Sequence, residues 1–274
     1  MSDTRRRDEG MTLPELLVCI VVVGLIGERA REVSDYVSRH MTGPKKDRSV
    51  IIAVPADHAA NLRLRGALYA CTVAEYFRAQ GKRVLLILDS LTRVAHAARE
   101  IALLLGEPGA ARGYPPSALS AITRIVERAG NSATSGGAVT GIYTVLADGD
   151  DHDDPVVDTA RAILDGHIVL SRDLAQRGHF PAIDVPASLS RVMDSLVDAD
   201  HRAHARKLRS LLAAFEANRD LMLMGAYREG SDPLFDQANA CKGAIDAFLQ
   251  QEPGSIATLP QSIADLAKAV GDEG

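Results

Sequence analysis

The chain has 274 residues, 46% of them hydrophobic, and a formal charge of −5 at pH 7. This balance gives no basic footprint and excludes nucleic acid as the first expectation for a partner. The three cysteines, Cys19, Cys71 and Cys241, form no C-x-x-C pair, so the sequence predicts neither a zinc site nor a disulfide framework and indicates a reducing cytosol.

The N-terminal segment combines a basic start with an apolar run. Residues 5–18 resemble the leader of type IV pilin-like proteins, with Gly10 before the apolar run and Glu15 near its start. The run over residues 16–26 is shorter than the roughly 20 residues that span a bilayer. We therefore favour a disordered basic tail over residues 1–18 that leads into a buried β-strand.

Apolar strand-like runs then alternate with helical patterns. The predicted strands are residues 16–25, 49–54, 84–88, 139–146 and 167–170. The predicted helices are residues 28–39, 59–80, 91–105, 117–128 and 155–164. Alternating strands and helices predict an α/β fold, with a mostly parallel sheet covered by helices on both faces.

The strand patterns stop after about residue 198. Residues 200–224, 232–250 and 260–270 carry helical patterns separated by Gly- and Pro-containing loops. The predicted organisation is therefore a tail (1–18), an α/β domain (19–198) and a small all-helical C-terminal domain (199–274).

Two carboxylates follow predicted strands. Asp89 ends the run Val-Leu-Leu-Ile-Leu-Asp-Ser-Leu-Thr-Arg (residues 84–93), and Glu28 follows the first strand. Ligands of open α/β sheets bind at the carboxyl ends of the strands, so both side chains are expected at one edge. There, one carboxylate can hold the water shell of Mg²⁺ while the other polarises an attacking water. Alternatively, Glu28 merely begins a helix and favours its N-terminal dipole.

The phosphate-binding counterpart of such a site is missing from the printed residues. No G-x-x-x-x-G-K-[ST] sequence, the Walker A loop that surrounds a triphosphate with N–H groups and a lysine, occurs in the 274 residues. Glu28 and Asp89 are both anions and repel a triphosphate. We therefore expect these residues alone to bind ATP weakly and to hydrolyse it negligibly.

The segment over residues 166–193 combines a strand, a Gly-His-Phe-Pro turn and an arginine near a helix start. Phe180, one of five phenylalanines, lies in the turn, where an aromatic ring can stack on a base or fill a local apolar gap. Arg191 is either a functional cation or an ordinary surface ion pair, which typically contributes less than about 1 kcal/mol.

Ordered blocks across residues 20–253 resemble the catalytic domain of the rotary F1-like ATPases. Within that group the chain is similar to the cytoplasmic ATPase of type III secretion systems and flagellar export. The blocks include Gly-Leu-Ile-Gly-Glu-Arg-Ala-Arg-Glu-Val (24–33), Leu-Leu-Ile-Leu-Asp-Ser-Leu-Thr-Arg (85–93), Arg-Gly-Tyr-Pro-Pro-Ser (112–117) and Ala-Tyr-Arg-Glu-Gly-Ser-Asp-Pro-Leu-Phe-Asp (226–236). Several blocks in order are more specific than one motif.

The resemblance implies a RecA/F1-like sheet, ATP and Mg²⁺ as cofactors, and a role for each matching residue. Glu28 matches the catalytic glutamate that activates water, and Arg29 the arginine beside it. Asp89 matches the Walker B aspartate, which organises Mg²⁺ through water. Phe180 matches the aromatic residue that packs against adenine, and Arg191 the arginine finger that reaches a neighbouring subunit.

The resemblance also implies partners and a cellular place. The family forms hexameric rings, so it implies a homo-oligomer with stalk, stator and export-gate proteins and chaperone–substrate complexes as partners. It implies a cytoplasmic ATPase peripheral to the inner membrane. Three interpretations stay open: an N-terminally truncated export ATPase, weak or inactive alone; a non-catalytic binding or regulatory fragment; and a reading frame whose true start lies upstream.

Overall fold

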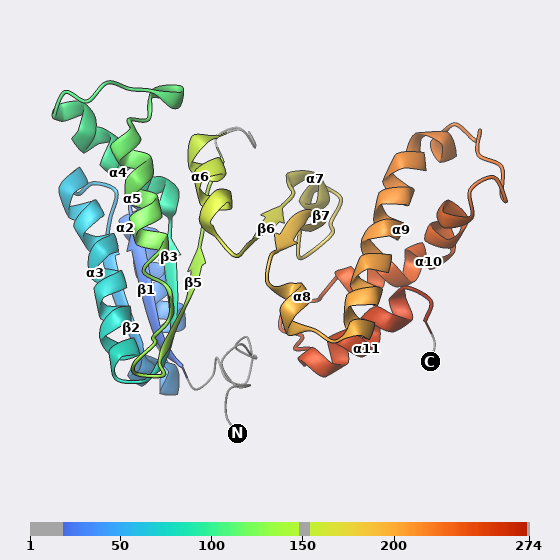
Figure 1. Cartoon of the computed structure of the whole chain (residues 1–274), viewed down its shortest axis with the longest axis horizontal. Coiled ribbons are helices and arrows are strands. Elements are labelled where there is room, and N and C mark those ends of the chain that lie inside the picture. The colour runs from blue at the N-terminus through green and yellow to red at the C-terminus, as the bar shows by residue number, and fades with distance from the viewer. Residues whose placement is uncertain (1–18, 148–153, 273–274) are drawn as a thin grey trace. The chain divides into compact units, whose positions relative to one another are not determined.

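The computed structural model describes residues 19–147 and 154–272 in two compact units (Figure 1). The first unit runs to Leu164 and the second starts at Asp165. The predicted tail over residues 1–18 and most of the acidic loop before Asp154 lie outside the described residues.

The first unit is built on a five-stranded sheet with the order β2-β1-β3-β5-β4. Four strands run parallel, and the short β4 pairs antiparallel with β5. The strands are β1 (Ile20–Ile26), β2 (Ser49–Val54), β3 (Arg83–Asp89), β4 (Gly130–Asn131) and β5 (Ala138–Tyr143). The predicted α/β fold with a mostly parallel sheet is confirmed.

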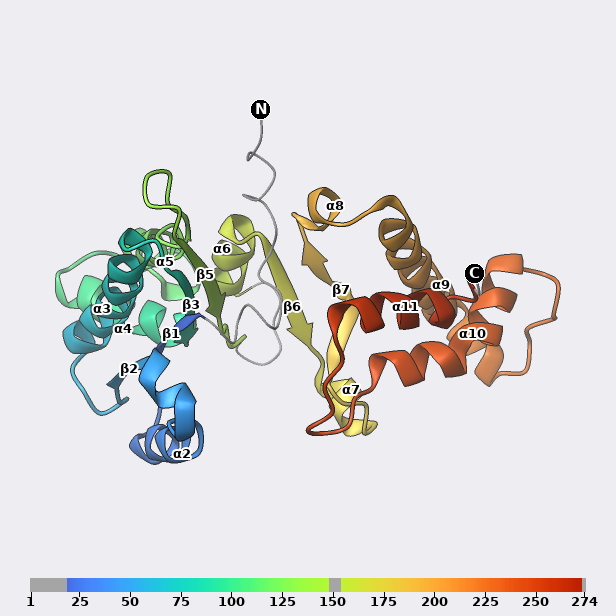
Figure 2. The same cartoon turned by 90° about the horizontal axis from the view of Figure 1, so that it is seen from below.

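Helix α3 packs along the sheet, and α4 packs against both α3 and α5 (Figures 1 and 2). The helical elements are α2 (Ala30–His40), η1 (Gly43–Arg48), α3 (Ala60–Ala79), α4 (Leu91–Leu104), η2 (Ala111–Gly113), α5 (Pro116–Val126) and α6 (Pro155–Ile163). The α3 helix ends before Gly81, whose φ of 75° is a conformation that suits glycine.

The core of the first unit lies between the sheet and helices α3 to α6. Its fully buried side chains come from alternate strand positions, such as Val22 and Leu86, and from helix faces, such as Ile122. Burying a side chain of this size contributes about 1.5–3 kcal/mol. Helix α2 contrasts with α3 to α6, because none of its residues is buried.

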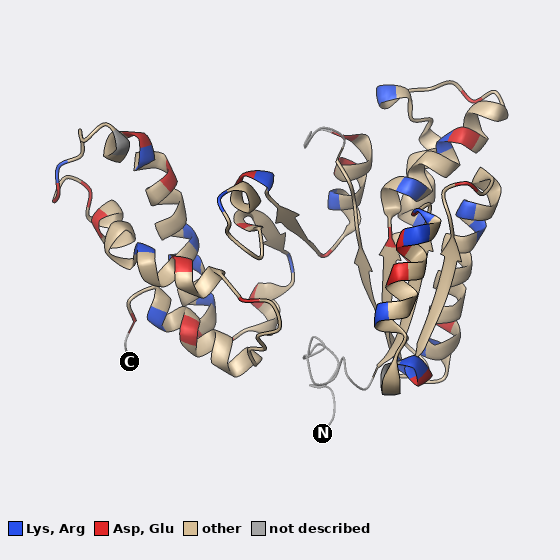
Figure 3. Ribbon diagram, turned by 180° about the vertical axis from the view of Figure 1, so that it is seen from behind, with Lys and Arg blue, Asp and Glu red and all other residues tan. Residues whose placement is uncertain are grey.

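The second unit combines a two-stranded sheet with a helical bundle. Its elements are β6 (Gly166–Leu170), α7 (Arg172–Gln176), β7 (Ile183–Ser190), α8 (Met193–Leu196), α9 (Ala199–Leu223), α10 (Pro233–Leu249) and α11 (Leu259–Ala269). Buried Leu211 and Ile245 join α9 and α10 in a second core. Acidic and basic residues share helices in both units (Figure 3), in keeping with the small net charge.

Two details of the predicted fold were wrong. The strand predicted at residues 167–170 exists as β6 but does not join the parallel sheet, because it pairs antiparallel with β7. The β7 strand was not predicted at all. Within the described ranges, no helix combines the length and apolar character that crossing a membrane requires.

Candidate functional site

The pairing of β1 with β3 brings Glu28 and Asp89 to one edge of the sheet. In this parallel register Leu25 lies opposite Asp89, the last residue of β3. Glu28 follows Leu25 by three residues, just beyond the end of β1. Both carboxylates therefore lie at the carboxyl end of the sheet, as predicted from the two strands.

A glycine turn carries Glu28 away from β1. Gly27 has a φ of 76°, and its N–H donates to the Val54 carbonyl at 2.8 Å. The Glu28 carbonyl accepts from the Ala56 N–H at 3.0 Å, which ties the turn to the chain after β2. The backbone on both sides of the Glu28 side chain is therefore fixed by hydrogen bonds to the neighbouring strand end.

Arg93 is a third charged group at this edge, and the sequence reasoning did not single it out. Its Nε lies 3.9 Å from Glu28 Oε1, and this Nε is buried without a hydrogen-bond partner in the described part of the chain. A Cβ atom at Gly27 would lie 2.9 Å from the Arg93 Cβ, so the arginine stem passes over the glycine. The available signal was Arg93 four residues after Asp89, in the first turn of a helix.

Asp89 is oriented by the end of the neighbouring strand. The Thr144 hydroxyl donates to Asp89 Oδ1 at 2.6 Å, just after β5 ends. This bond fixes one carboxylate oxygen and leaves Oδ2 for another donor. The buried Ser90 then begins α4 by accepting the Arg93 N–H at 3.3 Å.

The electrostatic surroundings raise the pKa of Glu28 above its ordinary value. The largest cause is burial, since the side chain is 18% exposed, and the next is the nearby negative charge of Asp89. Glu32 also raises the pKa, whereas the positive charge of Arg93 lowers it. A carboxylate whose pKa is raised is a stronger base, which is the property that proton abstraction from water requires.

The fit to Mg²⁺ depends on Asp89. Among the described residues, no group of three His, Cys, Asp or Glu side chains is arranged to hold a metal. Mg²⁺ commonly keeps most of its waters and binds through one or two carboxylates plus substrate phosphates, so a single carboxylate suits it.

Arg29, the predicted site residue next to Glu28, is 81% exposed, and its Nε lies 3.9 Å from Glu32 Oε1.

The other two predicted site residues belong to the second unit. Phe180 is 55% exposed, so it does not fill a buried gap, and its carbonyl accepts the Gln251 N–H at 2.9 Å. Arg191 follows β7, and its N–H donates to the Asp165 carbonyl at 2.8 Å. At both residues the backbone is therefore held by a hydrogen bond within the second unit.

Two family models match the chain. Residues 11–190 match the ATP synthase alpha/beta family, nucleotide-binding domain. Residues 197–268 match the T3SS EscN ATPase C-terminal domain. The first match ends at residue 190 and the second begins at residue 197.

Curated relatives and solved structures agree with these matches. The flagellum-specific ATP synthase of Salmonella typhimurium is 54% identical over 232 residues, which cover 85% of this chain and 51% of the relative. The type 3 secretion system ATPase of Pseudomonas syringae pv. tomato is 44% identical over 249 residues, which cover 91% of this chain and 55% of the relative. The chain thus spans about half the length of these curated relatives.

The solved structure of the assembled ATPase EscN from the enteropathogenic E. coli type III secretion system superposes with a TM-score of 0.87 at 42% identity. It covers 92% of this chain and 60% of the EscN chain. A second structure, of assembled EscN in complex with its central stalk EscO, has a TM-score of 0.82 at 41% identity.

Proposed function

Because this chain belongs to the ATP synthase alpha/beta family, we propose that it supplies the water-activating and metal-organising part of a protein-export ATPase. The observation that carries the proposal is the shared sheet edge of Glu28 and Asp89, where burial and the Asp89 charge raise the pKa of Glu28. The relatives named flagellum-specific ATP synthase and type 3 secretion system ATPase support export as the process.

Each site residue has a separate role in this proposal. Glu28 accepts a proton from the water that attacks the terminal phosphoryl group of ATP, while the bond from that group to ADP breaks and ADP leaves. Asp89 would hold Mg²⁺ through water molecules. When bound, Mg²⁺ neutralises charge on the phosphates. Arg93 balances the charge of Glu28, and Arg29 stands beside that glutamate.

The second unit contributes two further groups in this proposal. Phe180 packs against adenine, which is consistent with its exposed ring. Arg191 acts as an arginine finger toward a neighbouring subunit, where it stabilises charge on the transferred phosphoryl group. A finger supplied in trans requires an oligomer, so the proposal includes a homo-hexameric ring.

We extend the proposal to partners, location and domain limits. The assembled EscN structures support an oligomer and a stalk protein as partners. The further proposed partners are stator and export-gate proteins and chaperone–substrate complexes. The proposed location is the cytoplasm, at the inner membrane. The α/β domain is proposed to extend to about residue 198, followed by the helical domain.

We further propose that these 274 residues bind ATP weakly by themselves, because no Walker A sequence occurs among them. A ligand at one hundred times its dissociation constant adds about 2.7 kcal/mol to the unfolding free energy. Thermal unfolding with millimolar MgATP is therefore expected to show little shift. A large shift would contradict weak binding.

The titration of Glu28 tests the shared site without turnover. Carboxyl NMR of the 274-residue chain should give Glu28 a pKa above its ordinary value, and Asp89→Asn should lower that pKa by removing a nearby negative charge. Glu127→Gln, an exposed change at the end of α5, should leave it unaltered. An unchanged Glu28 pKa in Asp89→Asn would show that the carboxylates do not share a site.

A second candidate function is a non-catalytic module that docks to export partners. The lack of a Walker A sequence among the 274 residues favours it. Measuring MgATP turnover distinguishes the two candidates. Any MgATP hydrolysis by the chain should fall to background in Glu28→Gln and persist in Glu127→Gln. Hydrolysis that survives Glu28→Gln would refute the proposed base. Hydrolysis at background in every variant, together with an ordinary Glu28 pKa, would favour the second candidate.

A further inference from the structure

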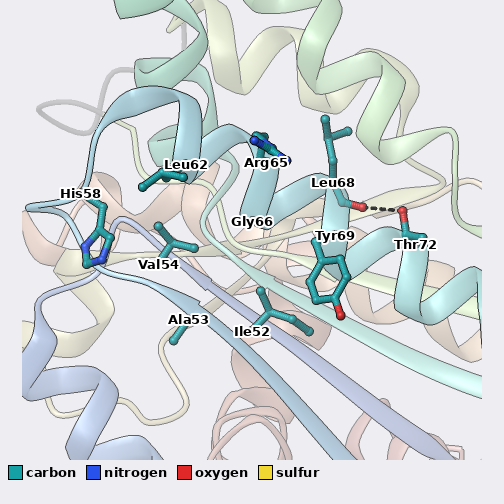
Figure 4. Close-up of a pocket in the computed structure, with 10 residues that line it drawn as sticks. All are labelled: Ile52, Ala53, Val54, His58, Leu62, Arg65, Gly66, Leu68, Tyr69 and Thr72. Atoms are coloured by element: carbon teal, nitrogen blue, oxygen red, sulfur yellow. Dashed lines mark hydrogen bonds between the residues drawn. The ribbon is translucent and has the colours of Figure 1, made fainter.

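An apolar groove lies between strand β2 and helix α3, away from the carboxylates (Figure 4). This β2–α3 groove has a volume of about 650 Å³ and includes Ile52 and Val54 of the strand and Leu62, Arg65 and Tyr69 of the helix. The side chains of Leu62 and Tyr69 are 45% and 61% exposed. The helix therefore presents apolar surface that the described part of the chain does not cover.

The strand beside the groove is an edge strand. β2 ends the sheet order, and β1 is its neighbour in the described sheet. The Val54 carbonyl accepts from Gly27, so the peptide groups of Val54 point toward β1. Because directions alternate along a strand, the N–H and C=O groups of Ile51 and Ala53 point to the open edge. Such groups are a template for another strand.

Gly66 brings the helix close to this edge. A Cβ atom at Gly66 would lie 2.5 Å from Val54 Cγ2, so α3 approaches β2 at this position more closely than a larger residue allows. Leu62, Arg65 and Tyr69 then share one helix face beside the strand, at i, i+3 and i+7. From residue 62 to residue 72 the helix rises about 15 Å, the length of about four or five strand residues.

The charge of the groove defines what fits it. Its lining has a cation, Arg65, and a histidine, His58, but no Asp or Glu. His58 is hydrogen-bonded to the exposed Asp57 at 3.1 Å, and the nearby Arg63 pairs with Glu100 at 2.7 Å. Within the described residues, Arg65 has no ionic partner. An occupant with a carboxylate is therefore complementary to the groove.

We propose that the β2–α3 groove binds an extended, acidic segment of another polypeptide. The segment adds to β2 as a further strand, buries alternate apolar side chains against Leu62 and Tyr69, and places a carboxylate at Arg65. An edge strand beside a helix is a known geometry for recognising extended peptides, in which backbone hydrogen bonds give affinity and side-chain pockets give specificity. Glu28 and Asp89 do not line this groove, so the proposal does not depend on ATP hydrolysis.

Fluorescence anisotropy with a defined probe tests the charge match. The probe is a fluorescein-labelled eight-residue peptide of alternating valine and threonine with one central glutamate, titrated with the 274-residue chain. Saturable binding is expected, at least about tenfold weaker when lysine replaces the glutamate. Arg65→Glu should reverse this preference, whereas Arg124→Glu, an exposed change on α5, should retain it. The same preference in Arg65→Glu and the unaltered chain would overturn the proposal.

Backbone methylation of the probe tests strand addition without changing the protein. N-methyl groups on the peptide amides of one edge should weaken binding at least about tenfold, while the same groups on the other edge should be tolerated, because one edge pairs with β2. Equal effects of the two patterns would overturn strand addition. Analytical ultracentrifugation should show that the peptide does not change the oligomeric state of the chain. A dimer that dissociates when the peptide binds would show that the groove binds a second copy of the chain instead.

Discussion

Glu28 and Glu75, both in the first unit and both partly buried beside an arginine, have pKa values that shift in opposite directions. Arg128 Nε donates to Glu75 Oε1 at 2.7 Å and lowers the pKa of Glu75, an effect that outweighs the opposing effect of burial. Glu28 stands 3.9 Å from Arg93, too far for a hydrogen bond, and burial and Asp89 raise its pKa.

The contrast distinguishes a stabilising contact from the candidate functional site. Arg128 also donates to the Leu68 carbonyl at 3.2 Å and to Thr72 Oγ1 at 2.9 Å, so it joins the segment after α5 to helix α3. At the Glu28 edge the charge of Asp89 raises the pKa of Glu28 and the charge of Arg93 lowers it, and the Arg93 Nε has no hydrogen-bond partner in the described chain. An arrangement that opposes ionisation is common where a side chain must exchange protons.

The largest expected effect on stability is at Gly27, the glycine of the turn before Glu28. Gly27→Ala should lower the unfolding free energy by about 2–4 kcal/mol, because alanine disfavours a φ of 76° and its Cβ meets the Arg93 stem. Urea unfolding followed by circular dichroism measures it. Gly43→Ala is the matched control, since Gly43 also has a positive φ but no atom within 4 Å of an added Cβ. Equal costs would contradict the close packing of Arg93.

A smaller loss is expected at the Arg128 contact. Glu75→Gln should lower the unfolding free energy by about 1–2 kcal/mol at pH 7, since it removes a charge-assisted hydrogen bond in a partly exposed pair. The pKa of Glu75 is lowered in the folded state, so its contribution is present above the unfolded pKa and is lost as pH falls through the folded pKa. Denaturant titrations between pH 3 and pH 7, with Glu127→Gln as reference, measure this dependence. A loss of unfolding free energy in Glu75→Gln that does not change with pH would contradict the linkage.

The smallest expected effect has the opposite sign. Glu28→Gln should stabilise the chain at pH 7, because ionised Glu28 is disfavoured by burial and by Asp89. Its raised pKa means that the favourable, protonated form is present below the unfolded pKa and is lost as pH rises through the folded pKa. The stabilisation by glutamine should therefore shrink as pH falls. Thermal unfolding of both chains as a function of pH measures this effect. A lower stability of Glu28→Gln at pH 7 would contradict the raised pKa of Glu28.

The sequence was sufficient to predict the elements that form the candidate site. The apolar runs of β1 and β3, each followed by a carboxylate, predicted a shared sheet edge because parallel strands end together. The part played by Arg93 was not predictable in this way. Its contact with Glu28 depends on a stem that crosses Gly27, and that crossing depends on the packing of α4 against the end of β1.

The second unit shows where strand patterns are ambiguous. The run Ile-Asp-Val-Pro-Ala-Ser-Leu-Ser (183–190) includes Pro186, which argues against a strand inside a sheet but is tolerated in a two-stranded one. Residues 167–170 were predicted as a strand, yet nothing in these four residues specifies which neighbour the strand pairs with. Both errors arise because strand pairing depends on contacts far along the chain.

The hydrogen bond from Thr144 to Asp89 has a mechanical consequence. The Thr144 carbonyl also accepts the Leu91 N–H at 2.9 Å, and the Leu146 N–H donates to Thr92 Oγ1 at 2.8 Å. These hydrogen bonds connect the segment after β5 to the start of α4 and to the Asp89 carboxylate. We therefore expect a displacement of residues 144–146 to move the Asp89 carboxylate directly, whereas the backbone of Glu28 is hydrogen-bonded to Ala56, after β2.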